Sequence, residues 1–203
     1  MYKGKISFKS LPDIGFAMRH SGIDYSAEYG HSSKKRVEIA YINSGSVNIT
    51  LYGKTITAPE GSVVVLFRHL PLMTKTKDGQ SYSHDTVLAE FEDLYFELEQ
   101  DDNFDFPDGF MSVPFVLMPS ADTEKIGVEI RRIVSDMTHN RDAFGFVSSL
   151  SFVGILKQLS DINILQSSIN VKAVNETVSK IKDYIQNNIE NTITVKNVAH
   201  FLR

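Results

Sequence analysis

Several ionisable side chains lie next to segments predicted as strands, where they could face a ligand. Arg68 and His69 follow the apolar run 62–67, and the pair could face an anionic or hydroxylated small molecule. A solvated loop at the end of that strand is the alternative. His84 either lines the mouth of a pocket or lies in a surface loop. These three side chains are the first candidates for ligand binding.

Glu38 is the candidate carboxylate, and it lies in a segment rich in β-branched and aromatic residues. One interpretation makes it a polar wall residue of a ligand pocket. The other makes it a strand carboxylate that pairs with Arg36 or Lys35. Both interpretations stay open, and Arg36 is therefore a ligand-binding candidate together with Glu38.

The sequence carries no pattern for nucleophilic or phosphate-transfer catalysis. It contains no cysteine, and no serine lies in a glycine-x-serine-x-glycine elbow. The glycines of the first half lie in separate predicted turns and not in one phosphate-binding loop. We therefore predict no catalytic residue and no cofactor.

The first half of the chain has the pattern of an antiparallel β domain. Its predicted strands share β-branched residues or period-two alternation, and turns that contain glycine or proline separate several of them: 37–42, 47–52, 55–57, 62–67, 86–91 and 112–118. Short strands at this spacing favour a sandwich or barrel over a parallel sheet.

From Ser120 onward the apolar residues recur with the period of an α-helix. A second predicted helix, 141–161, is apolar on more than one face. Burial inside one domain and a helix–helix dimer interface are the two alternatives for such faces. The residues that would form the dimer interface are Ile126, Ile130, Ile133, Met137, Phe152, Ile155 and Leu159.

The end of the sequence predicts a linker and the start of a further helical unit. The segment 166–170 is polar and is interpreted as structureless. After another helical pattern, Thr194 is a good N-cap for a short helix that carries Ala199 and Leu202 on its apolar face. A helix-turn-helix needs a second helix after that turn, and the sequence ends before one.

Charge and composition limit the partners of the chain. Its 21 basic residues and 25 acidic residues give a net charge of −4, whereas a DNA-binding module needs a basic surface. The chain itself is therefore not expected to bind DNA well. No apolar run suits a membrane span or a signal peptide, which together with the absence of cysteine predicts a cytoplasmic protein.

The order of these segments resembles the AraC/XylS-type transcription regulators. The strand pair around Glu38 and Gly45 looks like the opening of their cupin sensing domain, because the interval between these residues matches the first cupin motif. The turn at 59–61 resembles the second motif. The stretch 181–199 is similar to the start of the AraC-type DNA-binding domain, where an alanine packs at the position of Ala199.

This resemblance implies an α+β fold: an antiparallel cupin-like β-barrel (jelly roll), then an α-helical dimerisation unit and a truncated helix-turn-helix. The expected divisions are 1–118 for the effector-binding barrel, 119–165 for dimerisation, 166–173 for the linker and 174–203 for the DNA-binding start. Thr194, Ala199 and Leu202 would be scaffold residues of that last part.

The same resemblance implies the partners. A small-molecule effector, such as a sugar, would bind inside the barrel of a homodimer, and DNA would be bound only by the intact parent protein. No membrane is expected among the partners. The N-terminal segment with Arg19 and His20 could fold over the pocket, as the arm does in relatives.

Metal-dependent cupin enzymes hold their cation with three histidines and one glutamate. Here Glu38 lies at the glutamate position and His31 at the first histidine position, but Ser33 replaces the second histidine. Two ligands of four make a poor metal site, so no metal is predicted and His31 remains a ligand-binding candidate. The alternative function is a stand-alone metal-dependent cupin enzyme, a sugar isomerase or a dioxygenase.

Overall fold

The computed structural model describes residues 3–30, 34–99 and 109–187 of the chain. The chain divides into two compact units, residues 1–161 and 162–203. Within the described residues the first unit contains every strand, and their bounds are as follows: β1 Lys3–Ser7, β2 Asp13–Ile23, β3 Ser26–Glu28, β4 Arg36–Ser44, β5 Ser46–Leu51, β6 Lys54–Pro59, β7 Val63–Phe67, β8 Leu72–Lys75, β9 Ser81–Glu90, β10 Tyr95–Glu99, β11 Met111–Pro114 and β12 Val116–Leu117.

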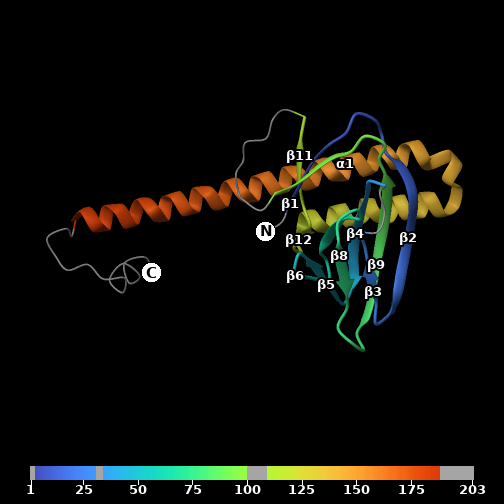
Figure 1. The fold of residues 1–203 in the computed structure, drawn as a ribbon, viewed down its shortest axis with the longest axis horizontal. Helices are drawn as coiled ribbons and strands as arrows, with labels where there is room; N and C mark the ends of the chain where they lie inside the picture. Colours follow the sequence, from blue (N-terminus) through green and yellow to red (C-terminus); the bar gives the residue numbers. More distant parts are fainter. Residues whose placement is uncertain (1–2, 31–33, 100–108, 188–203) are drawn as a thin grey trace. The chain divides into compact units, whose positions relative to one another are not determined.

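These strands form three antiparallel sheets (Figure 1). Sheet A has the order β10-β1-β11, sheet B the order β12-β7-β4-β9-β2, and sheet C the order β3-β8-β5-β6. A hairpin turn with glycine at positive φ joins the neighbours β5 and β6 at Gly53, whereas the turn at Gly45 carries the chain from β4 of sheet B to β5 of sheet C. The turn residues and the alternation of apolar side chains together explain the antiparallel pairing.

Sheet B has two different faces because side chains alternate along each strand. Glu38 in β4 lies opposite Leu66 in β7 and Leu88 in β9, so these three share the face toward sheet C. Tyr41 and Asp85 form another pair in the register and lie on the opposite face. The sheet therefore separates an interior, between sheets B and C, from a face that receives a helix.

The helix α1, Ala121–Asn187, begins at a reciprocal cap. The Ser120 amide donates to Thr123 Oγ1 at 2.8 Å, and the Thr123 amide donates to Ser120 Oγ at 3.2 Å. Asp122 and Glu124 add negative charge to the first turn, where the helix dipole favours it. The sequence 120–124 thus fixes where the helix starts.

Within the first unit α1 doubles back on itself (Figure 1). Gln158 Nε2 donates to Glu129 Oε1 at 3.1 Å, although the two residues are 29 positions apart. A straight helix would separate them by roughly 44 Å at about 1.5 Å per residue. The two stretches of α1 therefore lie side by side, as the two helices predicted from the sequence require.

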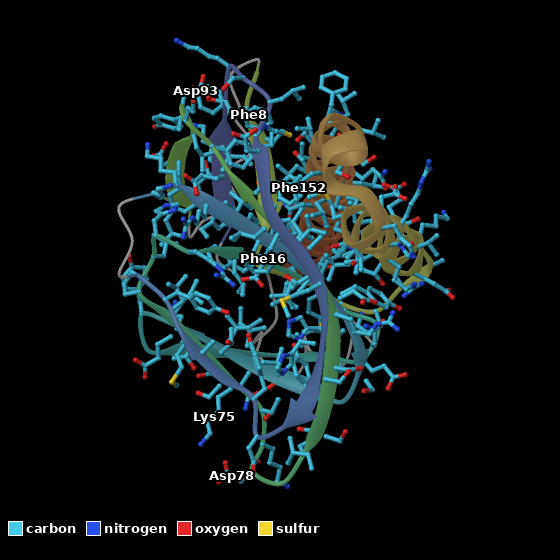
Figure 2. All side chains as sticks on the ribbon, turned by 90° about the vertical axis from the view of Figure 1, so that its right-hand side faces the viewer. Phe8, Phe16, Lys75, Asp78, Asp93 and Phe152 are labelled. Atoms are coloured by element: carbon cyan, nitrogen blue, oxygen red, sulfur yellow. The ribbon has the colours of Figure 1, made fainter. Side chains whose placement is uncertain are left out.

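Close aromatic packing attaches α1 to sheet B. Tyr41 lies so near Gly127 that a Cβ there would be 2.6 Å from the tyrosine ring, so a larger residue would force the ring or the helix to shift. Phe91 contacts Phe8 at a ring-centroid distance of 5.0 Å and Phe152 of α1 at 6.3 Å. Figure 2 shows Phe152 and Phe16 on opposite sides of β2, since Phe16 points to the interior.

The structure corrects the prediction of a closed barrel. Sheets B and C share no strand ladder among the described residues, so they are two open antiparallel sheets. The strands predicted between residues 37 and 91 are confirmed. The segment 112–118, predicted as one strand, forms β11 of sheet A and β12 of sheet B, and β1, β2, β3, β8 and β10 were not predicted. The segment with Arg19 and His20, expected as an arm, is the edge strand β2 and pairs with β9.

Two helical predictions also need correction. The expected linker 166–173 is helical, since α1 continues through it to Asn187. The seven residues expected at a dimer interface are buried inside one chain, between 0% and 9% exposed, because the folded-back helix and sheet B cover them: Ile126, Ile130, Ile133, Met137, Phe152, Ile155 and Leu159. The expected domain bounds remain predictions, and Thr194, Ala199 and Leu202 lie outside the described residues.

Candidate functional site

A buried ion pair lies on the interior face of sheet B. Arg68, at the end of β7, donates from Nε to Glu38 Oε2 of β4 at 2.7 Å. Thr86 of β9 donates from Oγ1 to the other Glu38 oxygen at 2.7 Å. The Glu38 side chain is only 3% exposed and that of Arg68 is 24% exposed. Both oxygens of this carboxylate are thus engaged inside the protein.

Aromatic rings surround the guanidinium of Arg68. The ring of Tyr29 lies 4.9 Å away and that of Phe16 lies 5.3 Å away, both within the range of cation–π attraction. The Tyr25 and Tyr29 hydroxyls are 3.3 Å apart. Because Tyr25 and Tyr29 flank β3 of sheet C and Phe16 lies in β2, the site spans both sheets.

Four further ring contacts extend the site along β2 and β9. His20 and His84 are cross-strand partners, with ring centroids 5.3 Å apart. Tyr25 contacts both histidines and Tyr82, at 5.0 to 5.3 Å. We call the whole set the interior cluster, and its members are Phe16, His20, Tyr25, Tyr29, Glu38, Arg68, Tyr82, His84 and Thr86.

Burial sets the protonation states of this cluster. It lowers the pKa of His84 to about 4, so the ring is neutral at neutral pH. It also raises the pKa of Tyr29 and Tyr82 far above the usual value, so both hydroxyls stay protonated. Although burial opposes the charge of Arg68, Glu38 raises its pKa. The Arg68–Glu38 ion pair therefore lies beside a neutral His84 in the interior cluster.

The members of the interior cluster differ in exposure. Phe16, His20, Tyr25, Tyr29 and Arg68 are all partly exposed. The remaining members are buried and form the floor: Glu38, Tyr82, His84 and Thr86. His84 Nδ1 is a buried nitrogen with no hydrogen-bond partner, so the floor offers an unused polar atom. Polar groups of the buried floor thus lie beside the partly exposed members, which we call the rim.

The structure brings three of the six predicted ligand-binding residues together: Glu38, Arg68 and His84. Arg36 does not join them, because it pairs with Glu90 at 2.9 Å. Glu38 pairs with Arg68. The interpretation that paired Glu38 with Arg36 or Lys35 is therefore wrong.

His69 lies away from the interior cluster although it follows Arg68 directly. Its ring contacts Phe96 at 4.8 Å and Phe67 at 6.3 Å, and both ring nitrogens are buried without a partner. The alternation along β7 sends Phe67 and His69 to one face and Arg68 to the other. The prediction that Arg68 and His69 face one ligand is wrong, and His31 lies outside the described residues.

Sequence reasoning missed the aromatic part of the interior cluster. Phe16, Tyr25, Tyr29 and Tyr82 come from strands β2 and β9 and from the ends of β3. For Tyr82 a signal existed, since it continues the period-two pattern of Thr86 and Leu88 toward the start of β9. Nothing in the sequence shows that the ends of β3 face Arg68, because that depends on how sheets B and C pack.

A hollow lies on the surface of the first unit, away from the interior cluster. It is a groove of about 480 Å³, lined by Leu11, Pro12, Asp13, Ile14, Met137, Gly145, Phe146 and Ser149. Among the lining residues that the structure describes, Asp13 is the charged one, and it is exposed. Among the described residues that line the groove, none has a buried polar side-chain atom without a hydrogen-bond partner. The interior cluster is therefore the stronger candidate for a ligand site.

Protonation of His84 provides a test of its buried position. The pKa of His84 is about 4 in the folded protein and has the ordinary histidine value in the unfolded chain. As the pH falls between these two values, the unfolded chain binds the proton and the folded protein does not, so the free energy of unfolding decreases. At about pH 5 we expect a loss of about 2 kcal/mol from this residue. His84→Phe should remove that part of the pH dependence, measured by urea unfolding across this pH range.

The matched control for this experiment is Met18→Phe, because Met18 is exposed on β2 and carries no ionisable group. Its replacement should leave the pH dependence as in the wild type. Equal slopes for the wild type and His84→Phe would show that His84 is not held neutral in the folded protein.

Comparisons with known proteins find structural likeness at a low level. No protein-family model and no curated protein matches the chain. The cupin domain of Cnp3 from Schizosaccharomyces pombe aligns at 16% identity and a TM-score of 0.32, covering 44% of this chain and 64% of that chain. A cupin domain of an XRE family transcriptional regulator from Enterobacter cloacae aligns at 11% identity and a TM-score of 0.31. The alignment covers 38% of this chain and 93% of that domain.

ToxT from Vibrio cholerae, in a structure with bound unsaturated fatty acid, aligns over more of the chain. The identity is 12% and the TM-score 0.40, covering 97% of this chain and 71% of ToxT. TM-scores below 0.5 assign neither a fold family nor a function. Among the described residues, no helix is long and apolar enough to cross a membrane.

Proposed function

We propose that this chain is the effector-binding part of a DNA-binding transcription regulator of the AraC type. The interior cluster binds the small-molecule effector between sheets B and C. The observation that supports this most is the Glu38–Arg68 pair, buried beside a neutral His84 with an unused ring nitrogen. DNA binding belongs to the intact parent protein in this proposal.

The physical basis is the cost of placing such groups in a protein interior. Replacing a buried ion pair by apolar residues of similar size is often neutral or stabilising, so stability alone does not account for Glu38 and Arg68. An unpartnered nitrogen such as His84 Nδ1 adds a further cost of about 1–3 kcal/mol. A ligand that binds these groups would offset that cost, which would explain why they lie in the interior.

The alternative of a metal-dependent enzyme has less support from the geometry. Both Glu38 oxygens already accept hydrogen bonds, and the positive charge of Arg68 lies where a cation would have to bind. No three histidine or carboxylate side chains form a metal-binding group within the described part of the chain. Glu38 is therefore better suited to orient Arg68 than to hold a metal ion.

The proposed function predicts ligand-dependent stabilisation. A library of small molecules should contain compounds that raise the melting temperature of the wild type. At about 100 times Kd such a compound stabilises the folded protein by about 2.7 kcal/mol. The double variant Glu38→Leu with Arg68→Met should lose this response. The matched control is Lys157→Met with Asp161→Leu, which removes an exposed ion pair of α1 and should respond as the wild type does.

Two results would contradict the proposal. Either no compound of the library stabilises the wild type, or the double variant keeps the full response. In the second case the compounds bind elsewhere, and the groove at Phe146 would be the next site to examine.

Dimerisation is a second part of the proposal, and it needs a different surface from the seven buried residues. Phe146, Val147 and Leu150 are exposed on α1, with Phe146 at 67%. Their spacing places them on one side of the helix, where a second copy could cover them. Phe146→Glu with Leu150→Glu should convert a dimer into a monomer in analytical ultracentrifugation. A wild-type monomer at micromolar concentration would contradict dimerisation through this face.

A further inference from the structure

The main charges of the interior cluster form an ion pair in the protein itself. Arg68 and Glu38 pair at 2.7 Å. Two other ionisable groups act on His84: His20, and Asp85, which itself pairs with Arg19 at 2.8 Å. Resting on the proposed function, we infer that this site takes an uncharged molecule with a flat ring and a carbonyl or hydroxyl oxygen, and discriminates against carboxylates and cations.

The hydrogen-bonding groups define what the ligand must present. Arg68 uses its Nε for Glu38, and its terminal nitrogens have no acceptor among the described side chains. A guanidinium has five N–H donors, so these nitrogens can donate to a carbonyl or hydroxyl oxygen. His84 Nδ1 lies unpartnered on the floor and can accept from or donate to a second polar group. An uncharged polar molecule satisfies all of these atoms.

A carboxylate would leave the site with an unmatched negative charge. It would bind the terminal nitrogens of Arg68 while Glu38 occupies Nε of the same guanidinium, so two carboxylates would share one cation within a few ångströms. Like charges this close oppose ionisation of both groups. His84 is neutral at neutral pH and supplies no second positive charge. Burial of the extra charge is therefore unfavourable.

Binding of a cation is also unfavourable at this site. Both oxygens of Glu38 are engaged by Arg68 and Thr86, so no free carboxylate oxygen remains to receive it. The guanidinium of Arg68 would lie beside it and repel it. The rings of Phe16 and Tyr29 already lie against the guanidinium of Arg68, so a second cation bound there would lie close to a like charge.

The aromatic rim accounts for the flat ring. Phe16, Tyr25 and Tyr29 are partly exposed and come from β2 and the two ends of β3. Aromatic pairs prefer offset or edge-to-face contacts, which a planar ligand can make with these rings. The rim would hold the ring of the ligand while the floor binds its oxygen.

Three planar probes of nearly equal shape test the inference: benzamide is uncharged, benzoate is an anion and benzamidine is a cation. Their affinities for the wild type would be measured by ligand-observed NMR titration at neutral pH. We expect benzamide to bind at least roughly tenfold more tightly than either charged probe. Glu38→Gln leaves the charge of Arg68 unmatched and should shift the preference to benzoate by at least roughly tenfold.

Glu97→Gln is the matched control, because Glu97 lies in β10 and pairs with Lys5 outside the interior cluster. It should keep the wild-type order of affinities. If Glu38→Gln fails to fold, the order measured for the wild type decides the inference by itself.

Benzoate or benzamidine binding to the wild type as tightly as benzamide would overturn the inference. That result would leave the proposed function standing, since the site would still bind a small molecule. Failure of all three probes to bind the wild type would also overturn it, whereas the proposed function is decided by the compound library and the double variant.

Discussion

Replacing Arg68 with methionine is expected to lower the free energy of unfolding by about 3–5 kcal/mol, because it leaves the Glu38 carboxylate buried without its cation. Glu38 would keep only the hydrogen bond from Thr86. Urea unfolding at neutral pH measures the loss. This is the largest single effect that the interior cluster predicts.

The same experiment contains its own control. Glu38→Leu combined with Arg68→Met removes both charges and should recover most of the lost stability, because the cost arises from the unpaired charge. Lys157→Met breaks an exposed pair with Asp161 and should change stability by less than about 1 kcal/mol. A small loss for Arg68→Met alone would mean that Glu38 is not buried as described.

Gly127→Ala is expected to destabilise the protein by about 2–3 kcal/mol. The new methyl group would lie 2.6 Å from the ring of Tyr41, and Arg131 covers that ring at 5.1 Å and limits its movement. This loss exceeds the gain of about 1 kcal/mol that alanine brings to a helix interior. Thermal or urea unfolding checks the prediction.

Gly154→Ala is the matched control in the same helix. No atom lies within 4 Å of a Cβ at that position, so only the gain in helix propensity remains. We expect Gly154→Ala to be neutral or to stabilise by up to about 1 kcal/mol. Equal effects of the two substitutions would show that α1 does not pack on Tyr41.

The strands that were predicted correctly are those whose side chains follow a simple rule. β5 alternates apolar and polar residues, and β7 is a continuous apolar run because it is covered on both faces. β2 escaped prediction because it is an edge strand in which Gly15, Arg19 and Gly22 interrupt the pattern. Its place in sheet B comes from pairing with β9, which a local pattern does not encode.

The candidate site shows the same limit at the level of single residues. Glu38 and Arg68 were predicted separately, but 30 positions separate them, and their contact depends on the register of β4 against β7. The prediction of the residues at the dimer interface shows a related limit. An apolar helix face has the same sequence pattern whether a second copy or the chain's own sheet covers it. Here the chain itself covers Ile130 and Phe152.

The most direct test of the central claim is a crystal structure of the protein with the compound that stabilises it most. We predict electron density between sheets B and C, with an oxygen of the compound within hydrogen-bond distance of Arg68 and a ring against Phe16 or Tyr29. Density in the groove at Phe146, with Arg68 and His84 left untouched, would contradict a ligand site in the interior cluster.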